Sequence, residues 1–314
     1  MSGAGMGGLG RLTAAVAGVL VLVSGCTTVV APPPGFAHGV PDYRPPKPDV
    51  AKILGDLTTL DPCSLTMPAD FGAVTAKPMS FDECGISIPG GATISVGMVD
   101  KVDTFQARGT PTEFQGMSYS IYSTPIMPCG RLLLFGDDLA LSVHMLAASG
   151  EGAAAQCDKV AEGFEKMLKR LKSSPKSVKH RTFPPASFGR VDACAVMPAA
   201  VVSALPTVRT WPSKHTCAWS DAGTQNELRV SFGVGELTDL PGNAIEVAGR
   251  KTEKLEEPMG DDAGCLLLGA HQVPHGDHEM SVLNLVRKGV KDAAAVCDQA
   301  VQYANQLWPV LPTP

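Results

Sequence analysis

The sequence predicts an α+β protein made of two similar tandem domains, each an antiparallel sheet with a short N-terminal helix, a packed C-terminal helix and two disulfides. Three observations support this prediction. The segment from Ala153 to Lys159 returns almost unchanged from Ala293 to Gln299, 140 residues further along. Eight cysteines form two sets of four with similar spacing. Apolar residues alternate with period two in the middle of each half, and they recur with a helical period at its end.

Length and composition agree with two globular domains. A chain of 314 residues is long enough for two domains of ordinary size. Hydrophobic residues make up 44% and charged residues 18%, which is a globular rather than a disordered profile. Aromatic residues are only 5%, so we expect mainly aliphatic cores. The formal net charge of −5 weighs against a nucleic-acid partner, and we expect none.

The N-terminus is expected to direct the protein to a membrane. Residues 1–25 have the pattern of a signal peptide, because Arg11 precedes an apolar run from Leu12 to Val23 that is short for a membrane span. The sequence Val23-Ser24-Gly25-Cys26 resembles the bacterial lipobox. That resemblance implies cleavage before Cys26, lipidation of its thiol and acylation of the new amine. The alternative is an ordinary cleaved signal followed by a chance cysteine.

A proline-rich segment follows the predicted lipid anchor. Residues 26–52 hold seven prolines between Pro32 and Pro48, which favours a semi-extended tether in the polyproline range. We therefore expect a lipid-anchored protein on the extracytoplasmic face of the cell membrane. The predicted folded domains span residues 53–172 and 188–314, with a basic linker at 173–187.

The remaining cysteines predict disulfides. An even number in an exported chain favours disulfide bonds, whereas the absence of any C-x-x-C pair weighs against zinc. We favour pairing first with second and third with fourth in each set, because consecutive elements are usually neighbours in space. The other two pairings within a set remain open. The favoured bonds are Cys63–Cys84, Cys129–Cys157, Cys194–Cys217 and Cys265–Cys297.

Residues around the cysteines carry a family resemblance. Asp61-Pro62-Cys63-Ser64-Leu65 is answered by Asp192-Ala193-Cys194-Ala195-Val196, and Cys217-Ala218-Trp219-Ser220 answers Cys84-Gly85-Ile86-Ser87. This pattern resembles the secreted four-cysteine domains of actinobacterial lipoproteins. It is similar in style to the extracellular sensor domains of some mycobacterial serine/threonine kinases. Across residues 55–172 and 188–310, the resemblance implies an α+β fold with disulfides and, by analogy, ligand sensing. It implies no catalytic residues.

The first domain is expected to run from a short helix to a long one. The helix follows Cys63 and extends through Val74, with Pro68 in an early turn. A strand covers Ile94 to Met98, and a hairpin joins residues 132–135 to 139–145 around Gly136-Asp137-Asp138. The closing helix has Ser149 as a plausible cap. Its apolar stripe consists of Cys157, Val160, Ala161, Phe164, Leu168 and Leu171.

The second domain repeats this order. A short helix runs from Pro198 to Leu205, and a half-buried strand runs from Leu228 to Val234. Two further strands cover residues 265–268 and 280–286. The closing helix stops at Pro309. Its apolar stripe consists of Cys297, Ala300, Val301, Ala304, Leu307 and Trp308.

Few residues suggest chemistry. The chain has no nucleophile elbow, H-E-x-x-H, Walker or EF-hand pattern. His271, His275 and His278 lie near acidic residues and could hold a metal ion, but a solvated turn is favoured, and no metal or cofactor is expected. Trp211 and Trp219 are interpreted as core residues, with a cleft as the alternative.

Charged segments are interpreted as solvated. The acidic residues between Glu253 and Asp262 are expected in a loop. The basic linker is expected to be exposed, with attraction to anionic envelope surfaces as the alternative.

Three functions remain possible from sequence. The favoured hypothesis is a non-enzymatic binding or sensing module with an unknown envelope ligand or protein partner. The alternatives are a carrier of lipid or another apolar ligand, and a hydrolase with dispersed catalytic residues. An apolar cavity of several hundred Å³ would favour the carrier, at about the size of a small-molecule site. A shallow groove between the two domains would favour the binding module.

Overall fold

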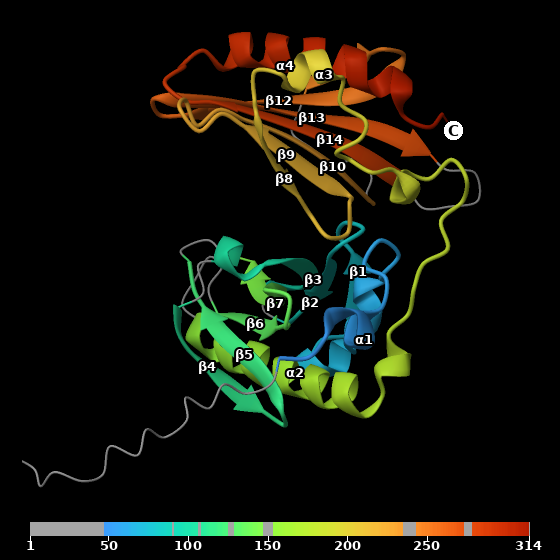
Figure 1. Ribbon diagram of the computed structural model, residues 1–314, viewed down its shortest axis with the longest axis vertical. Coiled ribbons are helices and arrows are strands. Elements are labelled where there is room, and N and C mark those ends of the chain that lie inside the picture. Colours follow the sequence, from blue (N-terminus) through green and yellow to red (C-terminus); the bar gives the residue numbers. More distant parts are fainter. Residues whose placement is uncertain are drawn as a thin grey trace, which may run out of the picture. The chain divides into compact units, whose positions relative to one another are not determined.

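The computed structural model describes residues 47–89, 91–105, 108–124, 129–146, 153–234, 243–272 and 278–313 (Figure 1). The predicted signal peptide, Cys26 and most of the tether lie outside these residues. By its internal contacts, Arg44–Pro314 forms one compact unit. Among the helices in the described ranges, none has the length and apolar character needed to cross a membrane.

Each half of the chain forms a seven-stranded antiparallel sheet. The first sheet has the order β1-β2-β3-β7-β6-β5-β4, and the second has the order β8-β9-β10-β14-β13-β12-β11. The two topologies are the same, so the predicted duplication and the α+β fold class are confirmed. The first set of strands is β1 (Thr75–Pro78), β2 (Cys84–Ser87), β3 (Thr93–Lys101), β4 (Arg108–Phe114), β5 (Met117–Tyr122), β6 (Gly130–Leu134) and β7 (Leu139–Leu146). The second set is β8 (Thr207–Thr210), β9 (Thr216–Ser220), β10 (Glu227–Val234), β11 (Asn243–Val247), β12 (Arg250–Met259), β13 (Asp262–Gln272) and β14 (His278–Arg287).

A long helix covers one face of each sheet (Figure 1). Helix α2 (Ala153–Ser173) follows the first sheet, and helix α4 (Ala293–Leu307) follows the second. In α2 the buried Val160, Phe164, Leu168 and Leu171 pack against the sheet core, as their spacing predicts. Helix α4 buries the equivalent stripe of Val296, Cys297, Ala300, Ala304 and Leu307. These side chains fill the space between each helix and its sheet.

All four disulfides join the favoured partners. The bonds are Cys63–Cys84, Cys129–Cys157, Cys194–Cys217 and Cys265–Cys297. In each half, one bond ties an early turn to the sheet, and the other ties the sheet to the closing helix. The third and fourth cysteines of each half thus fasten the helix to the sheet that it covers.

Short helices differ in detail from the prediction. The segment after Cys63 forms two 3-10 helices, η1 (Pro62–Leu65) and η2 (Pro68–Phe71), instead of one continuous helix. Thr66 and Met67 are extended between them, and the Asp70 carboxylate accepts a hydrogen bond from the Met67 N–H. In the second half, helix α3 (Ala199–Val202) is shorter than predicted.

The packed structure begins inside the predicted tether. Helix α1 (Val50–Leu54) is capped by the Asp49 carboxylate, which accepts a 2.8 Å hydrogen bond from the Ala51 N–H. Val50 and Leu54 are buried in the core of the first domain. The first domain therefore includes residues on the N-terminal side of the predicted boundary at residue 53.

Polar side chains line the face of the first sheet that points away from α2. Ser95, Ser120, Tyr122, Ser142 and His144 all project from this face and are buried. A small apolar cluster of Phe105, Leu132, Leu134 and Ala140 adjoins them. Burial lowers the pKa of His144 to about 4, because the charged imidazolium loses its hydration.

This burial of His144 predicts a loss of stability in acid. The folded-state pKa of about 4 lies below the ordinary 6.5, so the unfolded chain binds more protons between these values. The contribution of the neutral, buried His144 to the free energy of unfolding is therefore fully present above pH 6.5. It is lost as the pH falls from 6.5 to about 4. We expect His144→Asn to remove about 2–3 kcal/mol of the pH-dependent change in the free energy of unfolding. Urea denaturation at about pH 7 and about pH 4.5 measures it.

A surface histidine provides the control for this prediction. His180 is exposed, so His180→Asn is expected to leave most of the acid-induced change in place. An unchanged pH dependence in His144→Asn would contradict the assignment of that change to the buried imidazole.

Candidate functional site

The segment between the two domains is ordered and packs against both of them. At its start, the Asp61 N–H donates to the Lys179 carbonyl at 3.0 Å, and the Arg181 N–H donates to the Thr59 carbonyl at 2.6 Å. The Arg181 guanidinium also lies 3.5 Å from the Asp61 carboxylate. This stretch is thus fastened to the first domain by its backbone and by Arg181, while the side chains of Lys176, Lys179 and His180 are exposed, as expected from its composition.

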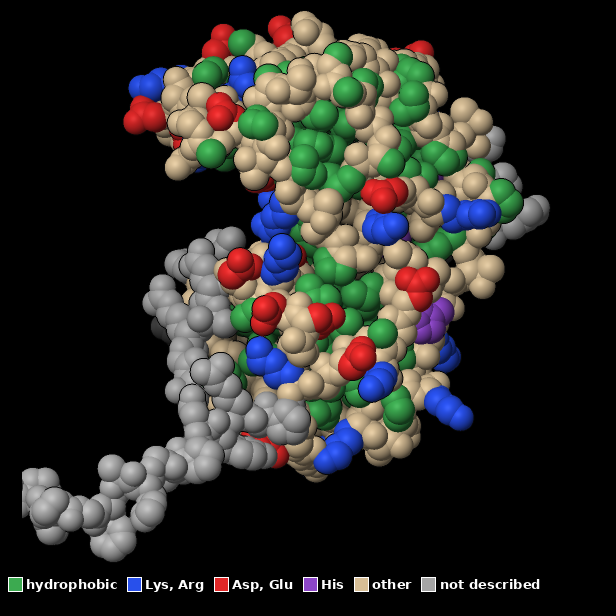
Figure 2. Space-filling view, in the orientation of Figure 1, with side chains coloured by type: hydrophobic (Ala, Val, Ile, Leu, Met, Phe, Trp, Pro, Cys, Tyr) green, Lys and Arg blue, Asp and Glu red, His purple; other side chains and the backbone are tan. Residues whose placement is uncertain are grey.

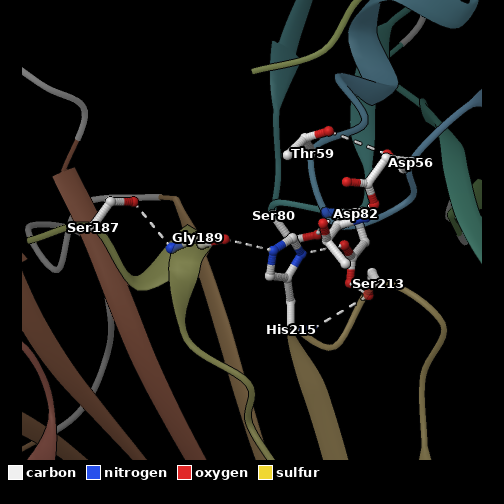
Figure 3. Close-up of polar contacts among 9 residues, drawn as sticks. Asp56, Thr59, Ser80, Asp82, Ser187, Gly189, Ser213 and His215 are labelled. Atoms are coloured by element: carbon white, nitrogen blue, oxygen red, sulfur yellow. Dashed lines mark hydrogen bonds and ion pairs between the residues drawn. The ribbon is translucent and has the colours of Figure 1, made fainter. Parts of the chain in front are cut away.

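The end of the segment is fastened to the second domain. Glu279 of β14 is buried, and its carboxylate accepts hydrogen bonds from the Ser187 hydroxyl at 2.5 Å and the Phe188 N–H at 2.6 Å. The Ser187 hydroxyl in turn accepts from the Gly189 N–H at 3.0 Å (Figure 3). These bonds fix the 3-10 helix η5 (Phe188–Arg190) and so set the direction of the Gly189 carbonyl.

A buried histidine joins the two domains at this point. His215, only 2% exposed, precedes β9 and places Nδ1 2.7 Å from Asp82 Oδ1 (Figure 3). Its Nε2 lies 3.2 Å from the Gly189 carbonyl. The Ser213 hydroxyl donates to the other Asp82 oxygen at 2.9 Å. Asp82 lies in the turn between β1 and β2, so one carboxylate of the first domain binds two side chains of the second.

The partners of His215 favour a ring that carries both protons. A carboxylate and a carbonyl oxygen are both hydrogen-bond acceptors, so each ring nitrogen completes its bond only as a donor. With both protons present, the ring forms an ion pair with Asp82, whose side chain is 18% exposed. Removing either member leaves the groups that it bonds without a hydrogen-bond partner in a largely buried place.

Aromatic packing surrounds this ion pair. Phe81, from the same turn as Asp82, is 2% exposed and belongs to the hydrophobic core of the second domain. Its ring centroid lies 5.2 Å from that of Phe183 and 5.0 Å from that of His215. Gly97 permits the turn to sit on β3, since a Cβ there would lie 2.4 Å from the Asp82 carbonyl oxygen.

The two turns that meet here occupy equivalent positions in the duplicated domains. Asp82 stands two residues before Cys84, and His215 stands two residues before Cys217. Ser80 and Ser213 each stand two residues earlier still, and each hydroxyl accepts a hydrogen bond from the backbone N–H of its own Asp82 or His215. The ion pair therefore joins one copy of a repeated turn to the other.

A groove of about 490 Å³ opens beside the ion pair, and we call it the junction groove. Its wall carries hydroxyl and cationic groups from both domains and from the segment between them. The lining residues are Thr58, Thr59, Arg181, Thr182, Phe183, Gly189, Arg190, Val191, Asp192, Ser213, Lys214 and His215. Most of the lining residues are polar or charged, although polar and apolar atoms share the wall about equally, and His215 and the Gly189 backbone form part of its base.

The cations of the junction groove differ in how far they are already paired. Arg181 is engaged by Asp61, and Lys214 lies 3.8 Å from Asp192 with both side chains well exposed. Arg190 is exposed, and within the described ranges no ion pair holds its side chain. Hydrogen bonds from Thr58 lower the pKa of the nearby Asp56 carboxyl, which therefore stays ionised beside the groove. Arg190 is thus the cation most available to a ligand.

Serine, histidine and aspartate meet here, but their hydrogen bonds differ from those of a catalytic triad. In a triad the histidine accepts from the serine hydroxyl and donates to the carboxylate. Here the Ser213 hydroxyl donates to Asp82, and the Nε2 of His215 is occupied by a backbone carbonyl. The geometry suits a structural junction better than activation of a nucleophile.

The other residues singled out in the sequence are dispersed. Trp219 is a core residue, whereas Trp211 lines a second hollow of about 240 Å³ and stacks 4.1 Å from the Arg209 guanidinium. His271 donates through Nε2 to the Ala186 carbonyl at 2.8 Å and lies beside Arg250, so its role is structural. His275 lies outside the described residues. Within those residues, no group of three side chains suited to a metal ion occurs.

The acidic stretch is a strand instead of the expected loop. Glu253, Glu256 and Glu257 belong to β12, which pairs with β13 over its length. Lys254 lies 3.0 Å from Glu256, and Lys288 lies 2.8 Å from Asp262. Elsewhere on the surface, Lys, Arg, Asp and Glu side chains are interspersed on the face shown in Figure 2. Glu256 and Asp262 are therefore paired with local cations, whereas Glu253 is buried.

Comparisons with known proteins give only remote likenesses. No protein-family model matches the chain, and no curated protein matches its sequence. The chain is similar to DynU16, a protein of the dynemicin biosynthetic locus, at 12% identity over 84% of this chain and 94% of that chain, with a TM-score of 0.19. It is similar to the di-domain ARO/CYC StfQ of the steffimycin pathway at 11% identity, over 83% and 94% of the two chains, with a TM-score of 0.19. It is also similar to the MucA/MucB complex of Pseudomonas aeruginosa at 11% identity, over 70% of this chain and 81% of that chain, with a TM-score of 0.14. These TM-scores are too low to carry an argument about function.

Proposed function

We propose that the chain is a non-enzymatic binding module of the cell envelope, lipid-anchored through Cys26, and that its ligand occupies the junction groove. The observation that carries the proposal is the groove itself, which is about 490 Å³ and lined by both domains. Small-molecule sites commonly have volumes of this order and contain a few fixed polar groups. The eight disulfide-bonded cysteines support an extracytoplasmic location.

The rigidity of the groove base supports binding over catalysis. His215, Asp82 and Gly189 hold one another in place, so the groove is already formed before a ligand enters. Preformed sites lose less conformational entropy on binding. Arg190 and the Thr182 hydroxyl project from the segment that joins the domains and are exposed for contact with a polar ligand.

Binding in the groove is preferred to carriage of an apolar ligand between sheet and helix. That space is filled in both domains, because Phe164, Met167 and Leu168 are buried against the first sheet and Ala300 and Ala304 against the second. The groove, by contrast, presents hydroxyls and charges. These features favour a polar ligand of a few hundred Å³ over an acyl chain.

Native mass spectrometry of protein purified from its own envelope tests this proposal. We expect wild type to carry a small molecule and Arg190→Glu/Lys214→Glu to lose most of it, because two groove cations become anions. Lys291→Glu is the matched control, since Lys291 is an exposed cation paired only with Asp261 in the described structure. Equal occupancy in the groove variant and the control would contradict the proposal, as would a hydrolytic activity abolished by Ser213→Ala.

A further inference from the structure

The hollow of about 240 Å³ beside Trp211 lies where the first domain rests on the second sheet. The β1–β2 turn and β3 supply one wall, and β9, β10 and β14 supply the other. The contact between the two domains is close here, because a Cβ added to Gly233 would lie 3.4 Å from the Ser80 Cα. We call this space the methionine hollow, after Met79, Met98 and Met280, which all line it.

Two hydroxyls project into the methionine hollow from the second sheet. Cys217 and Val230 are buried in the core beneath α4, and successive side chains of a strand point to opposite faces. Thr216 and Ser231 therefore project from the face that points away from α4, where they lie opposite each other in the β9–β10 register. Among the described residues, neither hydroxyl has a hydrogen-bond partner, so both can bind a ligand.

The three methionines supply an adaptable apolar wall. Met79 is 36% exposed and lies over β2, because a Cβ added to Gly85 would be only 2.6 Å from its sulfur. Met98 and Met280 are half-buried. Methionine is unbranched and its thioether is polarisable, so it can pack against apolar and aromatic groups of different shapes. Val282 adds a further apolar side chain to the same wall.

The charged groups around the methionine hollow already have partners. The Arg229 guanidinium lies 2.7 Å from the Glu227 carboxylate, and both side chains are exposed at the surface. The Asp82 carboxylate is held by two side chains of the second domain. Glu83 accepts a 2.9 Å hydrogen bond from Ser95, and burial raises the pKa of its carboxyl. These contacts favour an uncharged ligand, because a charged one would lose its hydration without gaining a free counter-ion.

The volume of the methionine hollow restricts the size of its ligand. An apolar cavity of about 150 Å³ holds benzene, and sites for drug-sized molecules begin at about 300 Å³. A space of about 240 Å³ therefore suits one ring or a short alkyl body that carries a small polar group.

We propose that the methionine hollow is a second binding site, separate from the junction groove, for a small uncharged molecule with an aromatic or alkyl body and one hydroxyl or carbonyl group. The body packs against the three methionines, and the polar group hydrogen-bonds with Thr216 and Ser231. A serine or threonine hydroxyl can donate or accept, so an alcohol and a ketone both match it. The methionine hollow and the junction groove share no lining residue, so each can be occupied without the other.

NMR of the full chain with ¹³C-labelled methionine methyl groups tests this site directly. The probe is benzyl alcohol at up to about 10 mM, because we expect a ligand of so few atoms to bind with a Kd of about 1 mM. We expect saturable shifts of the Met79, Met98 and Met280 methyl resonances, assigned through single Met→Leu variants. Met259 on β12 is the internal control, since it is exposed and lies outside the hollow.

Two charged analogues of the probe test the chemical class. Benzoate and benzylammonium have the same ring, and we expect neither to give saturable shifts at these three methionines. Failure of benzyl alcohol to shift them would overturn the proposal, as would an equal shift at Met259 or tighter binding of either charged analogue.

A variant that fills the hollow gives an independent test. Val282→Phe places a larger side chain in the space, and we expect the Kd for benzyl alcohol to rise about tenfold or more. Val286→Phe is the matched control, because Val286 lies on the same strand and face but does not line the hollow. Arg190→Glu/Lys214→Glu should bind benzyl alcohol as wild type does, which separates this site from the junction groove. Equal Kd values in Val282→Phe and Val286→Phe would overturn the proposal.

Discussion

Asp82→Ala is expected to lower the free energy of unfolding by about 3–5 kcal/mol, because it removes the carboxylate that holds Nδ1 of the buried His215 ring and leaves two buried polar groups without their partner. The substitution also removes the acceptor of the Ser213 hydroxyl. His215 is 2% exposed and lies 2.7 Å from Asp82, whose side chain is 18% exposed, so we expect water to offset only part of the loss. Urea denaturation of the full chain at neutral pH measures the effect.

A surface ion pair in the same groove provides the control. Asp192→Ala breaks the exposed contact with Lys214 at 3.8 Å and one hydrogen bond from the Cys194 N–H at 2.9 Å, and we expect a loss of only about 1–2 kcal/mol. The double variant Asp82→Ala/His215→Ala should be less destabilised than the sum of its single variants, because the two residues share one hydrogen bond and the second change removes the ring left without its partner. Additive effects, or an Asp82→Ala variant as stable as Asp192→Ala, would mean that the junction does not depend on this pair.

Loss of the disulfide between β13 and α4 is expected to have an effect of similar size. Cys265→Ala/Cys297→Ala opens a loop of 32 residues, and loss of the cross-link should lower the free energy of unfolding by about 3–4 kcal/mol in the chain-entropy model. Both cysteines are fully buried, so two small cavities add to the loss. Denaturation of oxidised wild type and of the variant, under identical conditions, measures the difference.

The equivalent bond of the first half gives the comparison for this experiment. Cys129 and Cys157 are separated by 28 residues, so Cys129→Ala/Cys157→Ala should be destabilised by nearly the same amount. A change below about 1 kcal/mol in both variants would show that the helices stay on their sheets without covalent help.

The cysteine pattern and the apolar periodicity predicted the duplication, the disulfides and the two closing helices, because covalent bonds and periodicity are local or paired features. The alternation from Leu228 to Val234 predicted β10, and the stripe from Cys157 to Leu171 predicted α2. Strand β12 was missed because Glu and Lys have low strand propensity. Its pairing with β13 along the whole strand outweighs that propensity.

The junction could not be predicted from the same signals. Asp82 and His215 are 133 residues apart, and neither belongs to a recognisable motif. The sequence does hold one signal for the junction: Asp82 and His215 each stand two residues before the second cysteine of their half of the chain. Opposite charges at equivalent positions of a duplicated turn indicate that the two copies can bind each other. The buried atoms of Tyr122, Ser142 and His144 were also hidden, because a sequence does not show which polar residues of a strand are covered.

A crystal structure of the protein isolated with its native ligand tests most directly whether the junction groove is the ligand site. Our account predicts ligand density in the junction groove, in contact with Arg190 and Thr182 and above the His215–Asp82 pair. Density found instead between a sheet and its covering helix, with the junction groove empty, would contradict it and favour a carrier of apolar molecules.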